Sequence, residues 1–445
     1  MKKILALALA VLMVLSLCAC GASVDTASLD EIQAHLDAIE ASLQSIVGAQ
    51  EAAPAEEAAD EAAEPAEELK TDVLPIGLMI HTSDWFASVD APNYYEFHAM
   101  VDYINEDLGG WQIGDTLYTI EAVDQDGQSS GDQLRVCAQA LVDQGVNFVV
   151  ETNDFWVLAC EDIFEEAGVL HASAYVTYTP GYMTEDNPMA FTASNGSAGD
   201  YATGFQVLKE VYPDVDSVIF VNDDNGCNED LFALMQQLGA EYGIEVKEDY
   251  IMYSGDTTDY SAYAQQIIDS GAACFMGNGS PDAYGYILKE LRAKGSDCVC
   301  ACLQGKPATT LMEYAGEDAC TRAFTLGTSQ RDTDMNTDIY NAIVAKDKEL
   351  NGEEIAANFD GAAANTLWVM LQMMQKAGSI DPEVVAAEWE KGGEVETIYG
   401  TGTIGGEVTY GVANHALGSP RAVSVVDPEG EDGWYFYGWI DVTIA

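Results

Sequence analysis

Residues 217–230 read SVIFVNDDNGCNED, and this stretch sets the pattern for most of the chain. The apolar run at 217–222 has the length and composition of a buried strand. A polar loop at 223–227 follows it, and Asn228 is a good N-cap for a helix over 228–242. A buried strand that leads through a polar loop into a helix is the repeating unit of a helix-covered parallel sheet. The stretch therefore predicts an α/β fold.

The same alternation continues on both sides of this stretch and divides into two series. Before residue 193 we expect strands at 73–80, 117–123, 147–150 and 170–174 and helices at 94–106, 130–144 and 159–167. After residue 193 we expect helices at 195–212, 228–242, 260–270 and 281–294 and strands at 217–222, 245–253, 272–276 and 298–303. Two such series predict two doubly wound, three-layer α/β/α lobes.

The chain after Phe324 adds further elements. We expect helices at 338–350, 360–377 and 382–391 and short antiparallel strands at 397–399, 407–410, 422–426 and 434–439. These elements are expected to complete both sheets, so that the chain crosses between the lobes more than twice and builds a multi-strand hinge. The predicted boundaries are 72–192 plus about 325–420 for the first lobe, and 193–324 plus about 421–445 for the second.

The N-terminus has the features of an export signal. Two lysines precede an apolar run at 4–17, about 14 residues, which suits a signal peptide and is short for a membrane-spanning helix. Residues 17–21 read LCACG and resemble the bacterial lipobox, with Cys20 as the acceptor because a small residue precedes it. We therefore predict a lipoprotein signal peptide at 1–19 and a mature chain anchored in the cell membrane through acylated Cys20.

Two segments separate Cys20 from the first predicted strand. In the first, at 20–47, apolar residues recur at alternating intervals of three and four: Leu29, Ile32, Leu36, Ile39, Leu43 and Ile46. This short heptad pattern is open to two interpretations, a weakly self-associating coiled coil and a lone amphipathic helix. The second, at 48–71, is rich in Ala, Glu and Pro and is predicted to be an acidic, disordered linker.

The charge balance excludes several classes of partner. The chain has 17 basic and 75 acidic residues, a formal net charge of −58. Phosphate backbones and anionic lipid surfaces would be repelled, so nucleic acid is not an expected partner. After Cys20 no run approaches 18 apolar residues, so we expect the rest of the chain outside the cytoplasmic membrane.

Eight cysteines follow the lipobox: Cys137, Cys160, Cys227, Cys274, Cys298, Cys300, Cys302 and Cys320. Cys298, Cys300 and Cys302 alternate, so on a strand all three point to one face. No histidine lies nearby to complete a tetrahedral metal set. We expect buried thiols and no metal or cofactor, with a disulfide as the alternative.

The order of elements resembles the branched-chain amino acid-binding family of type I periplasmic binding proteins, from Asp72 to the C-terminus. Seven passages carry the resemblance: Pro75 to Met79 before a loop, a helix from Tyr95 that ends in Ile104-Asn105, Gly114 to Val123 before an acidic turn at Asp124 to Asp126, Gln144 to Val150, Glu166 to Leu170 leading to Ser173, Ser254 to Ser261, and Asn414-His415 to Arg421. The resemblance implies two lobes that close on a ligand held by loops at the carboxyl ends of strands. The same location is favoured in α/β proteins in general, because helix N-termini at the carboxyl ends of strands offer free N–H groups to a ligand.

In the first lobe, three loops are candidates for ligand binding. Trp85 follows the first strand and offers a ring for stacking. The loop after the third strand contains Asn153, Asp154, Phe155 and Trp156, where the family presents hydroxyl groups to a ligand carboxylate. Asp154 would repel a carboxylate. After the next strand, Tyr175 and Thr177 match the family's second ligand loop.

The second lobe offers three further loops. Asp224 and Asn225 lie between a predicted strand and the helix at 228–242. Gly279 and Ser280 precede a helix that begins with Pro281, and glycine permits close backbone approach to a ligand. Gln304 stands near the position where amino-acid binders carry a carboxylate for the ligand's ammonium group. These residues favour a neutral or cationic ligand, while the resemblance favours an amino acid.

The resemblance implies an extracytoplasmic substrate-binding component of an ABC importer, with a permease and its ATPase as partners. Two other classes remain open: a receptor module that signals to a membrane partner, and an enzyme. The GxGxxG match at 400–405 is interpreted as a turn because a β-type run follows it, whereas dinucleotide binding needs a helix there. His81 and His171 could meet in the cleft, but structural roles are favoured and no catalytic residue is assigned.

Overall fold

The structure is a computed structural model that describes residues 69–84, 86–177, 181–224, 228–357 and 359–444. The chain divides into two compact units, 1–68 and 69–445, and only the second is described. The predicted signal peptide, the acceptor Cys20, the heptads and nearly all of the linker lie outside the described residues. The first strand begins at Lys70, so the last two residues of the predicted linker, 70 and 71, belong to this strand.

The first lobe is built on a six-stranded sheet in the order β2-β3-β1-β4-β5-β6. Its strands are β1 Lys70–Ile80, β2 Trp111–Ile113, β3 Thr116–Asp126, β4 Phe148–Glu151, β5 Leu170–Ser173 and β6 Ala190–Thr192. All neighbours are parallel except β2, which pairs antiparallel with β3. The carboxyl ends of the parallel strands therefore meet at one edge, as the sequence predicts.

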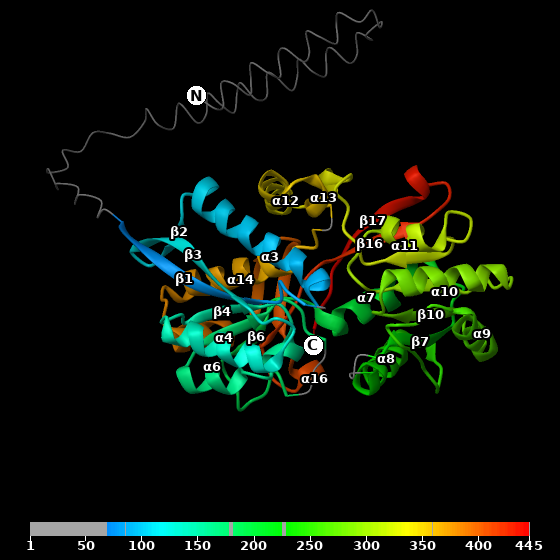
Figure 1. The fold of residues 1–445 in the computed structure, drawn as a ribbon, viewed down its shortest axis with the longest axis horizontal. Coiled ribbons are helices and arrows are strands. Elements are labelled where there is room, and N and C mark those ends of the chain that lie inside the picture. The colour runs from blue at the N-terminus through cyan, green and yellow to red at the C-terminus, as the bar shows by residue number, and fades with distance from the viewer. Residues whose placement is uncertain (1–68, 85, 178–180, 225–227, 358, 445) are drawn as a thin grey trace, which may run out of the picture. The chain divides into compact units, whose positions relative to one another are not determined.

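Helices from two distant parts of the chain cover this sheet (Figure 1). The N-terminal part supplies α3 Ala87–Asp102, the π-helical turn η1 Tyr103–Asp107, α4 Gly131–Asp143, α5 Asp154–Val157 and α6 Glu161–Ala167. The C-terminal part supplies α12 Asp338–Asn351, α13 Glu353–Ala356, α14 Ala362–Ala377 and α15 Pro382–Trp389. Helices α12 and α14 both contact α3, so the first lobe is completed by residues far along the chain.

The second lobe is built on a sheet in the order β17-β16-β12-β11-β10-β7-β8, with β9 also paired to β7. Its strands are β7 Ser217–Asp223, β8 Glu245–Val246, β9 Ile251–Tyr253, β10 Cys274–Gly277, β11 Val299–Cys302, β12 Ala323–Thr325, β16 Arg421–Val426 and β17 Trp434–Ile440. Its helices are α7 Gly196–Val211, α8 Asn228–Tyr242, α9 Ser261–Ser270, α10 Pro281–Ala293 and α11 Ala308–Ala315. The last two strands join antiparallel, so this sheet is mixed.

A separate three-stranded antiparallel sheet corrects the prediction that the late strands complete both sheets. It consists of β13 Gly393–Thr397, β14 Gly400–Gly405 and β15 Ala416–Gly418. The GxGxxG segment is strand β14 and not a turn. The run after it, predicted as a strand, is the short helix α16 Glu407–Tyr410, because Gly406 adopts φ +118° and reverses the chain there.

Two smaller differences concern strand ends. The predicted strand at 245–253 is two short strands, β8 and β9, since the polar residues 247–250 interrupt it. The predicted strand at 397–399 is the turn after β13, which ends at Thr397. Short 3-10 turns complete the secondary structure at η2 Thr333–Met335 and η3 Glu431–Gly433.

The hydrophobic interior forms three clusters. One is confined to the first lobe with the three-stranded sheet, and another lies in the second lobe. The third runs from Met79 and Leu141 in the first lobe to Phe220 and Leu303 in the second, with Val442 and Ile444 in the same cluster. The hydrophobic interior is therefore separate for each lobe on one face of the sheets and continuous between the lobes on the other.

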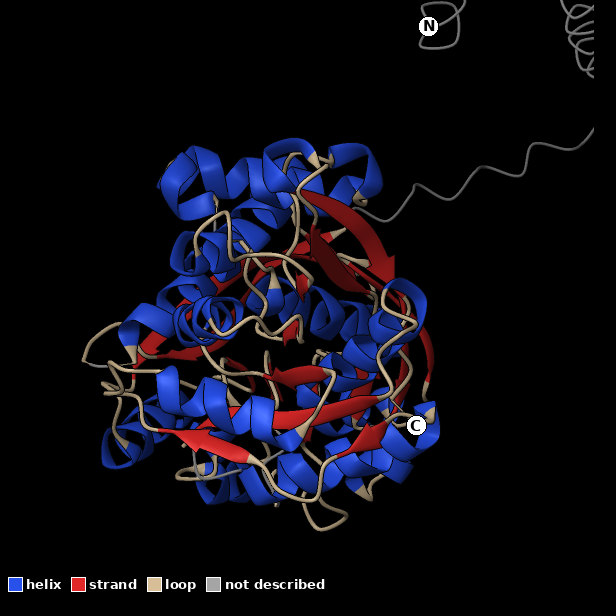
Figure 2. Ribbon diagram, turned by 90° about the vertical axis from the view of Figure 1, so that its right-hand side faces the viewer, coloured by secondary structure: helices blue, strands red, loops and turns tan. Residues whose placement is uncertain are grey.

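The chain crosses between the lobes at three places that lie close together. It passes to the second lobe at 193–196, returns at 326–337, and passes again at 419–421. Figure 2 shows the helices and strands of this unit from a second side. The last residues approach the hinge as well, because the carbonyl oxygen of Ile444 lies 2.4 Å from the position of a side-chain carbon at Gly405.

The alternating cysteines behave as predicted. Cys298, Cys300 and Cys302 all belong to the second-lobe cluster, whereas the intervening Val299 and Ala301 belong to the shared cluster on the opposite face of β11. All seven described cysteines beyond Cys20 are buried and free. Burial raises the pKa of the Cys302 thiol to about 12, so this thiol stays protonated. Cys227 lies outside the described residues.

Candidate functional site

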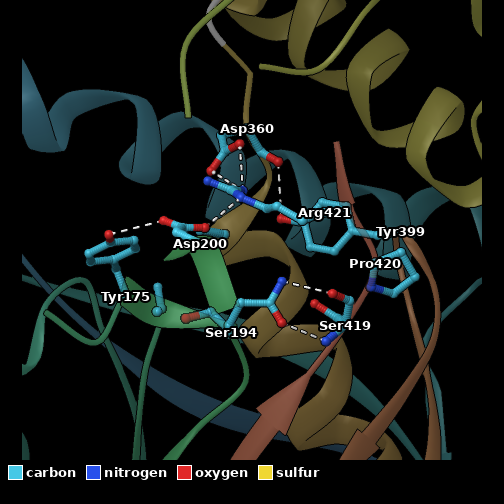
Figure 3. A pocket seen from close by; sticks show the side chains of 12 residues that line it. Tyr175, Ser194, Asp200, Asp360, Tyr399, Ser419, Pro420 and Arg421 are labelled. Carbon is cyan, nitrogen blue, oxygen red and sulfur yellow. Dashed lines mark hydrogen bonds and ion pairs between the residues drawn. The ribbon is translucent and has the colours of Figure 1, made fainter. Parts of the chain in front are cut away.

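A cavity lies where the chain passes between the lobes. It has about 310 Å³ of empty space, part of which is open to solvent. Figure 3 shows the side chains that line it. They come from the loop after β5, the crossing segments at 193–196 and 419–421, the first turns of α7, the start of α14 and the turn after β13. The lining residues are Ala174, Tyr175, Ser194, Asn195, Gly196, Asp200, Asp360, Ala362, Tyr399, Ser419, Pro420 and Arg421.

The floor of this cavity is an ion-pair network centred on Arg421. The Nε atom of Arg421 lies 2.9 Å from Oδ1 of Asp200, and its Nη1 atom lies 3.2 Å from Oδ1 of Asp360. Asp200 is on α7 of the second lobe, Asp360 precedes α14 of the first, and Arg421 begins β16. Their side chains are 2%, 26% and 11% exposed, respectively, so the network is largely shielded from solvent.

Gly305 is required by this packing. A side-chain carbon at Gly305 would lie 2.7 Å from Nη2 of Arg421 and 3.0 Å from Oδ1 of Asp360. The absence of a side chain therefore lets the loop after β11 lie directly against the guanidinium group.

Burial shifts the proton equilibria of the carboxyl groups around Arg421. Desolvation raises the pKa of Asp200 to about 6, although Arg421 acts in the opposite direction. Desolvation and the nearby Asp360 raise the pKa of Glu96 to about 8, and Glu96 Oε1 accepts a hydrogen bond from the amide of Asp360 at 2.9 Å. Burial disfavours the charged guanidinium of Arg421, but the two aspartates outweigh this effect and raise its pKa.

Hydrogen bonds from the second lobe reach Tyr175, a predicted ligand residue of the first. Nδ2 of Asn278 lies 3.0 Å from the Tyr175 hydroxyl and 3.2 Å from the Ser197 hydroxyl. The Tyr175 hydroxyl in turn donates to Oδ2 of Asp200 at 3.2 Å. The loop between β10 and α10 thus contributes to the site through Asn278, a residue that the sequence did not single out.

The neighbouring positions Gly279 and Ser280 pack against Tyr253. The amide of Ser280 donates to the Tyr253 hydroxyl at 3.1 Å, and a side-chain carbon at Gly279 would lie 2.1 Å from the same oxygen. The glycine therefore makes room for a tyrosine of its own lobe. Asp224 is exposed, with its amide bonded to the carbonyl of Tyr253, and Gln304 is half-buried beside Gly305.

The predicted first-lobe loops are bonded to each other. The amide of Thr177 donates to Oδ1 of Asp154 at 2.9 Å, and Nδ2 of Asn153 donates to the Thr177 hydroxyl at 3.2 Å. Asp154 is fully buried. Its carboxylate therefore bonds within the loop, and Asp154 is not among the residues that line either cavity. Trp85, Asn225 and the side chain of Phe155 lie outside what the structure describes.

Asn153 and Trp156 line a second, smaller cavity of about 180 Å³ together with His81 and Glu151. Burial lowers the pKa of His81 to about 4, and its Nδ1 atom accepts a hydrogen bond from the amide of Ser129 at 2.9 Å. His171 is buried in β5, with Nδ1 2.6 Å from Oε1 of Glu151. Each histidine is thus held in its own hydrogen bond within the first lobe.

Sequence reasoning missed Asp200, Asp360 and Asn278. Asp200 looked like an ordinary helical residue, because only the fold brings α7 against β16. Arg421 lay inside the turn that carried the family resemblance, yet a single arginine gives no sign of its partners. Charged residues are rarely buried without a partner, so a buried arginine in an acidic chain implies nearby carboxylates. This rule does not say which of the many acidic residues they are.

Among the described residues, no group of three or more His, Cys, Asp or Glu side chains could hold a metal ion. The helices of the described residues are all too short or too polar to cross a membrane.

The chain has two α/β lobes that are joined by several crossings, and residues of both lobes line the cavity beside these crossings. This arrangement defines a type I binding protein, the class of two-lobed proteins with a hinge and a ligand cleft. The family model described as "Periplasmic binding protein" matches residues 73–429, so the chain belongs to this family. The family implies an extracytoplasmic location.

Solved structures with the same fold support this classification. A leucine-binding protein of Thermotoga maritima is 17% identical, with 83% of this chain and 99% of that chain covered and a TM-score of 0.63. A leucine-, isoleucine-, valine-, threonine- and alanine-binding protein of Brucella ovis in its closed conformation is 16% identical, with coverage of 84% and 95% and a TM-score of 0.66. An ABC transporter solute-binding protein of R. palustris in complex with 4-hydroxybenzoate is 17% identical, with coverage of 84% and 97% and a TM-score of 0.63. No curated protein matches the chain.

Proposed function

We propose that this chain is the extracytoplasmic substrate-binding component of an ABC importer. It captures a small polar solute, an amino acid or a related amide or amine, between its lobes and delivers it to a permease driven by an ATPase. The family membership supports a binding role, and the similar structures are named for binding amino acids or aromatic acids in ABC transporters. It performs no catalysis of its own.

The observation that carries this proposal is the position of the cavity. Its lining joins Tyr175 from the first lobe to Asp200 from the second, and the chain crossings at 193–196 and 419–421 border it. A ligand in this place touches both lobes, so its binding energy favours the state in which they are close together. A permease can then distinguish loaded from empty protein by the relative position of the lobes.

The test is ligand binding together with closure. The mature chain would be screened by thermal melting against amino acids, amides, amines, aromatic acids and sugars, and each binder would be followed by small-angle X-ray scattering. We expect at least one solute to raise the melting temperature and reduce the radius of gyration. A broad panel without any such solute would contradict the proposal.

A receptor module that signals to a membrane partner would use the same two lobes and the same ligand-induced closure. Genes for permeases and ATPases next to the gene for this chain favour the importer, and a gene for a membrane sensor favours the receptor. An enzyme would turn its ligand over. Mass spectrometry of the bound solute after long incubation detects this, and loss of turnover in His81→Ala would support an enzyme.

The proposal includes a lipid anchor at Cys20, which keeps the protein at the membrane where its permease lies. Cells labelled with a clickable palmitate analogue should yield a labelled protein. The label should disappear in Cys20→Ala and persist in the matched control Cys18→Ala. Retention of label in Cys20→Ala would refute this anchor. Weak self-association through the heptads at 29–46 is a further proposal, to be tested by sedimentation of the mature chain at increasing concentration.

A further inference from the structure

The hydrogen-bond donors around the cavity are largely used within the protein. The hydroxyl of Tyr399 donates to the carbonyl of Asp360 at 3.0 Å, and the hydroxyl of Tyr175 donates to Asp200. Nδ2 of Asn195 donates to the carbonyl of Ser419 at 2.7 Å. Nη1 of Arg421 bonds Asp360, whereas Nε lies 2.9 Å from Asp200 without an aligned hydrogen bond. A ligand that needs donors, such as a carboxylate, would have to compete with acceptors already in place.

Acceptors and negative charge are in excess at the same place. Two carboxylates, Asp200 and Asp360, share one guanidinium group, which leaves the charged side chains of the lining with one uncompensated negative charge. Lys306 is near Glu96 but makes no ion pair with any described carboxylate. Asp360 is the most exposed of the three and can accept further hydrogen bonds from a ligand.

A buried acceptor atom beside the cavity lacks a partner among the described residues. It is Oδ1 of Asn278, on the residue whose Nδ2 bonds Tyr175. Glu96, which retains its proton because its pKa is about 8, is not counted as such an acceptor. A buried acceptor without a donor is costly, so Oδ1 of Asn278 indicates a missing donor at this position.

Two tyrosine rings complete the lining, at Tyr175 and Tyr399 (Figure 3). The face of an aromatic ring attracts a cation, and the attraction grows when the cation is shielded from water. Aromatic faces next to carboxylates are complementary to an ammonium group and not to a carboxylate.

We propose that this cavity binds the cationic ammonium group of the solute, with Asp360 and Asp200 as its counter-ions and the tyrosine rings beside it. The inference rests on the proposed function and narrows it, because the solute is then an amine or an amino acid held chiefly by its amino end. Acids without an amino group, such as the 4-hydroxybenzoate bound by the R. palustris protein, are excluded.

The proposal predicts that binding depends on pH. A cation favours ionised Asp200, whose pKa is raised to about 6 by burial and is also influenced by Arg421, Asp360 and the Tyr175 hydroxyl. Affinity for an amine should therefore rise as the pH increases through about 6, with release of a proton on binding near that pH.

The experiment uses matched triplets of compounds that share one carbon skeleton. One triplet is L-leucine, 3-methylbutylamine and 4-methylpentanoate, and another is L-tyrosine, tyramine and 3-(4-hydroxyphenyl)propanoate. Calorimetry on the mature chain should show binding of the amino acid or amine of at least one triplet and no binding of its acid. An acid or a neutral sugar that binds as tightly as any amine would overturn this inference while leaving the importer role intact. If no compound binds, including those of the broad panel, the result would contradict both this inference and the proposed importer role.

Variants locate the ammonium group. Asp360→Asn should weaken amine binding about 10–100-fold, because a hydrogen bond to a charged group is lost. Asp200→Asn should also remove the pH dependence near pH 6. If Asp200→Asn does not fold, Asp360→Asn still tests the proposal, because Asp360 is the more exposed of the two aspartates. Asp214→Asn, which removes an exposed partner of Arg322 at 2.6 Å, serves as the control and should leave affinity unchanged. Unchanged amine affinity in Asp360→Asn would overturn the proposal.

Discussion

The guanidinium of Arg421 and the carboxylate of Asp200 lie 2.9 Å apart, and this ion pair joins the strand that enters the second lobe to the first helix of that lobe. Asp360 extends the network into the first lobe. The three segments converge at the point about which the lobes would rotate. The network therefore lies both at the hinge and at the floor of the cavity, where it can link the position of the lobes to the occupant of the cleft.

Removal of the central charge should be strongly destabilising. Arg421→Met leaves Asp200 buried without a counter-ion, and breaking a buried ion pair in this way costs about 3–5 kcal/mol. The free energy of unfolding, measured in urea, should fall by that amount.

The matched control is Arg135→Met, which breaks an exposed pair with Asp162. Exposed pairs contribute about 0–1 kcal/mol, so the control should unfold almost like the parent protein. Equal stabilities for the two variants would show that the network around Arg421 is not shielded from solvent.

Glu96 should make stability fall as the pH rises. Its pKa is raised from 4.5 to about 8 by burial, so between these values the folded protein retains a proton that the unfolded chain has lost. The contribution of this group is therefore full below pH 4.5 and is lost as the pH rises toward 8, with a slope of about 1.4 kcal/mol per pH unit.

Glu96→Gln keeps the shape and removes the titration. Urea unfolding between pH 5 and about 8 should show a shallower decline for the variant than for the parent protein. Parallel pH profiles for the two proteins would contradict the burial of Glu96.

Gly305→Ala should disturb the cavity floor. The new methyl group would lie 2.7 Å from Nη2 of Arg421, so the guanidinium group or the loop has to move. We expect a lower melting temperature and weaker binding of any solute found in the panel. Gly255→Ala is a suitable control, because nothing lies within 4 Å of its new carbon. An effect no larger than that of the control would disprove the close approach.

The hydrogen bond between Asn278 and Tyr175 should favour the closed arrangement of the lobes. Asn278→Ala and Tyr175→Phe each remove it, at a cost of about 0.5–1.5 kcal/mol. Scattering of the ligand-free protein should show a larger radius of gyration for both variants. The double variant should be no more open than the single ones, because the two side chains share one interaction. Fully additive effects of the two substitutions would contradict a shared hydrogen bond between Asn278 and Tyr175.

The sequence was informative wherever a strand, a polar loop and a helix N-cap follow one another. Asn228 to Tyr242 forms a helix with the predicted bounds, and the alternating cysteines of β11 face one side as their spacing requires. Local periodicity determines these features, because each face of an element must be buried or exposed as a whole. The short strands β6, β12 and β15 were missed, since three residues are too few to show a period.

The site was harder to predict because it is made by long-range contacts. Tyr175 was correctly placed at the cavity, since it follows a strand and strand ends converge. Asp200 and Asp360 are separated by 160 positions and meet only because both reach Arg421. Asp154 follows a strand end as well, but its carboxylate is buried and accepts a hydrogen bond from the amide of Thr177, which a loop position alone does not reveal.

A crystal structure of the mature protein with a bound solute tests the central claim most directly. The account predicts electron density in the cavity, in contact with Tyr175 and Asp360 of the first lobe and with Asp200 or Asn278 of the second, and lobes at least as close as they are here. A solute bound elsewhere, or one that touches a single lobe, would contradict the account.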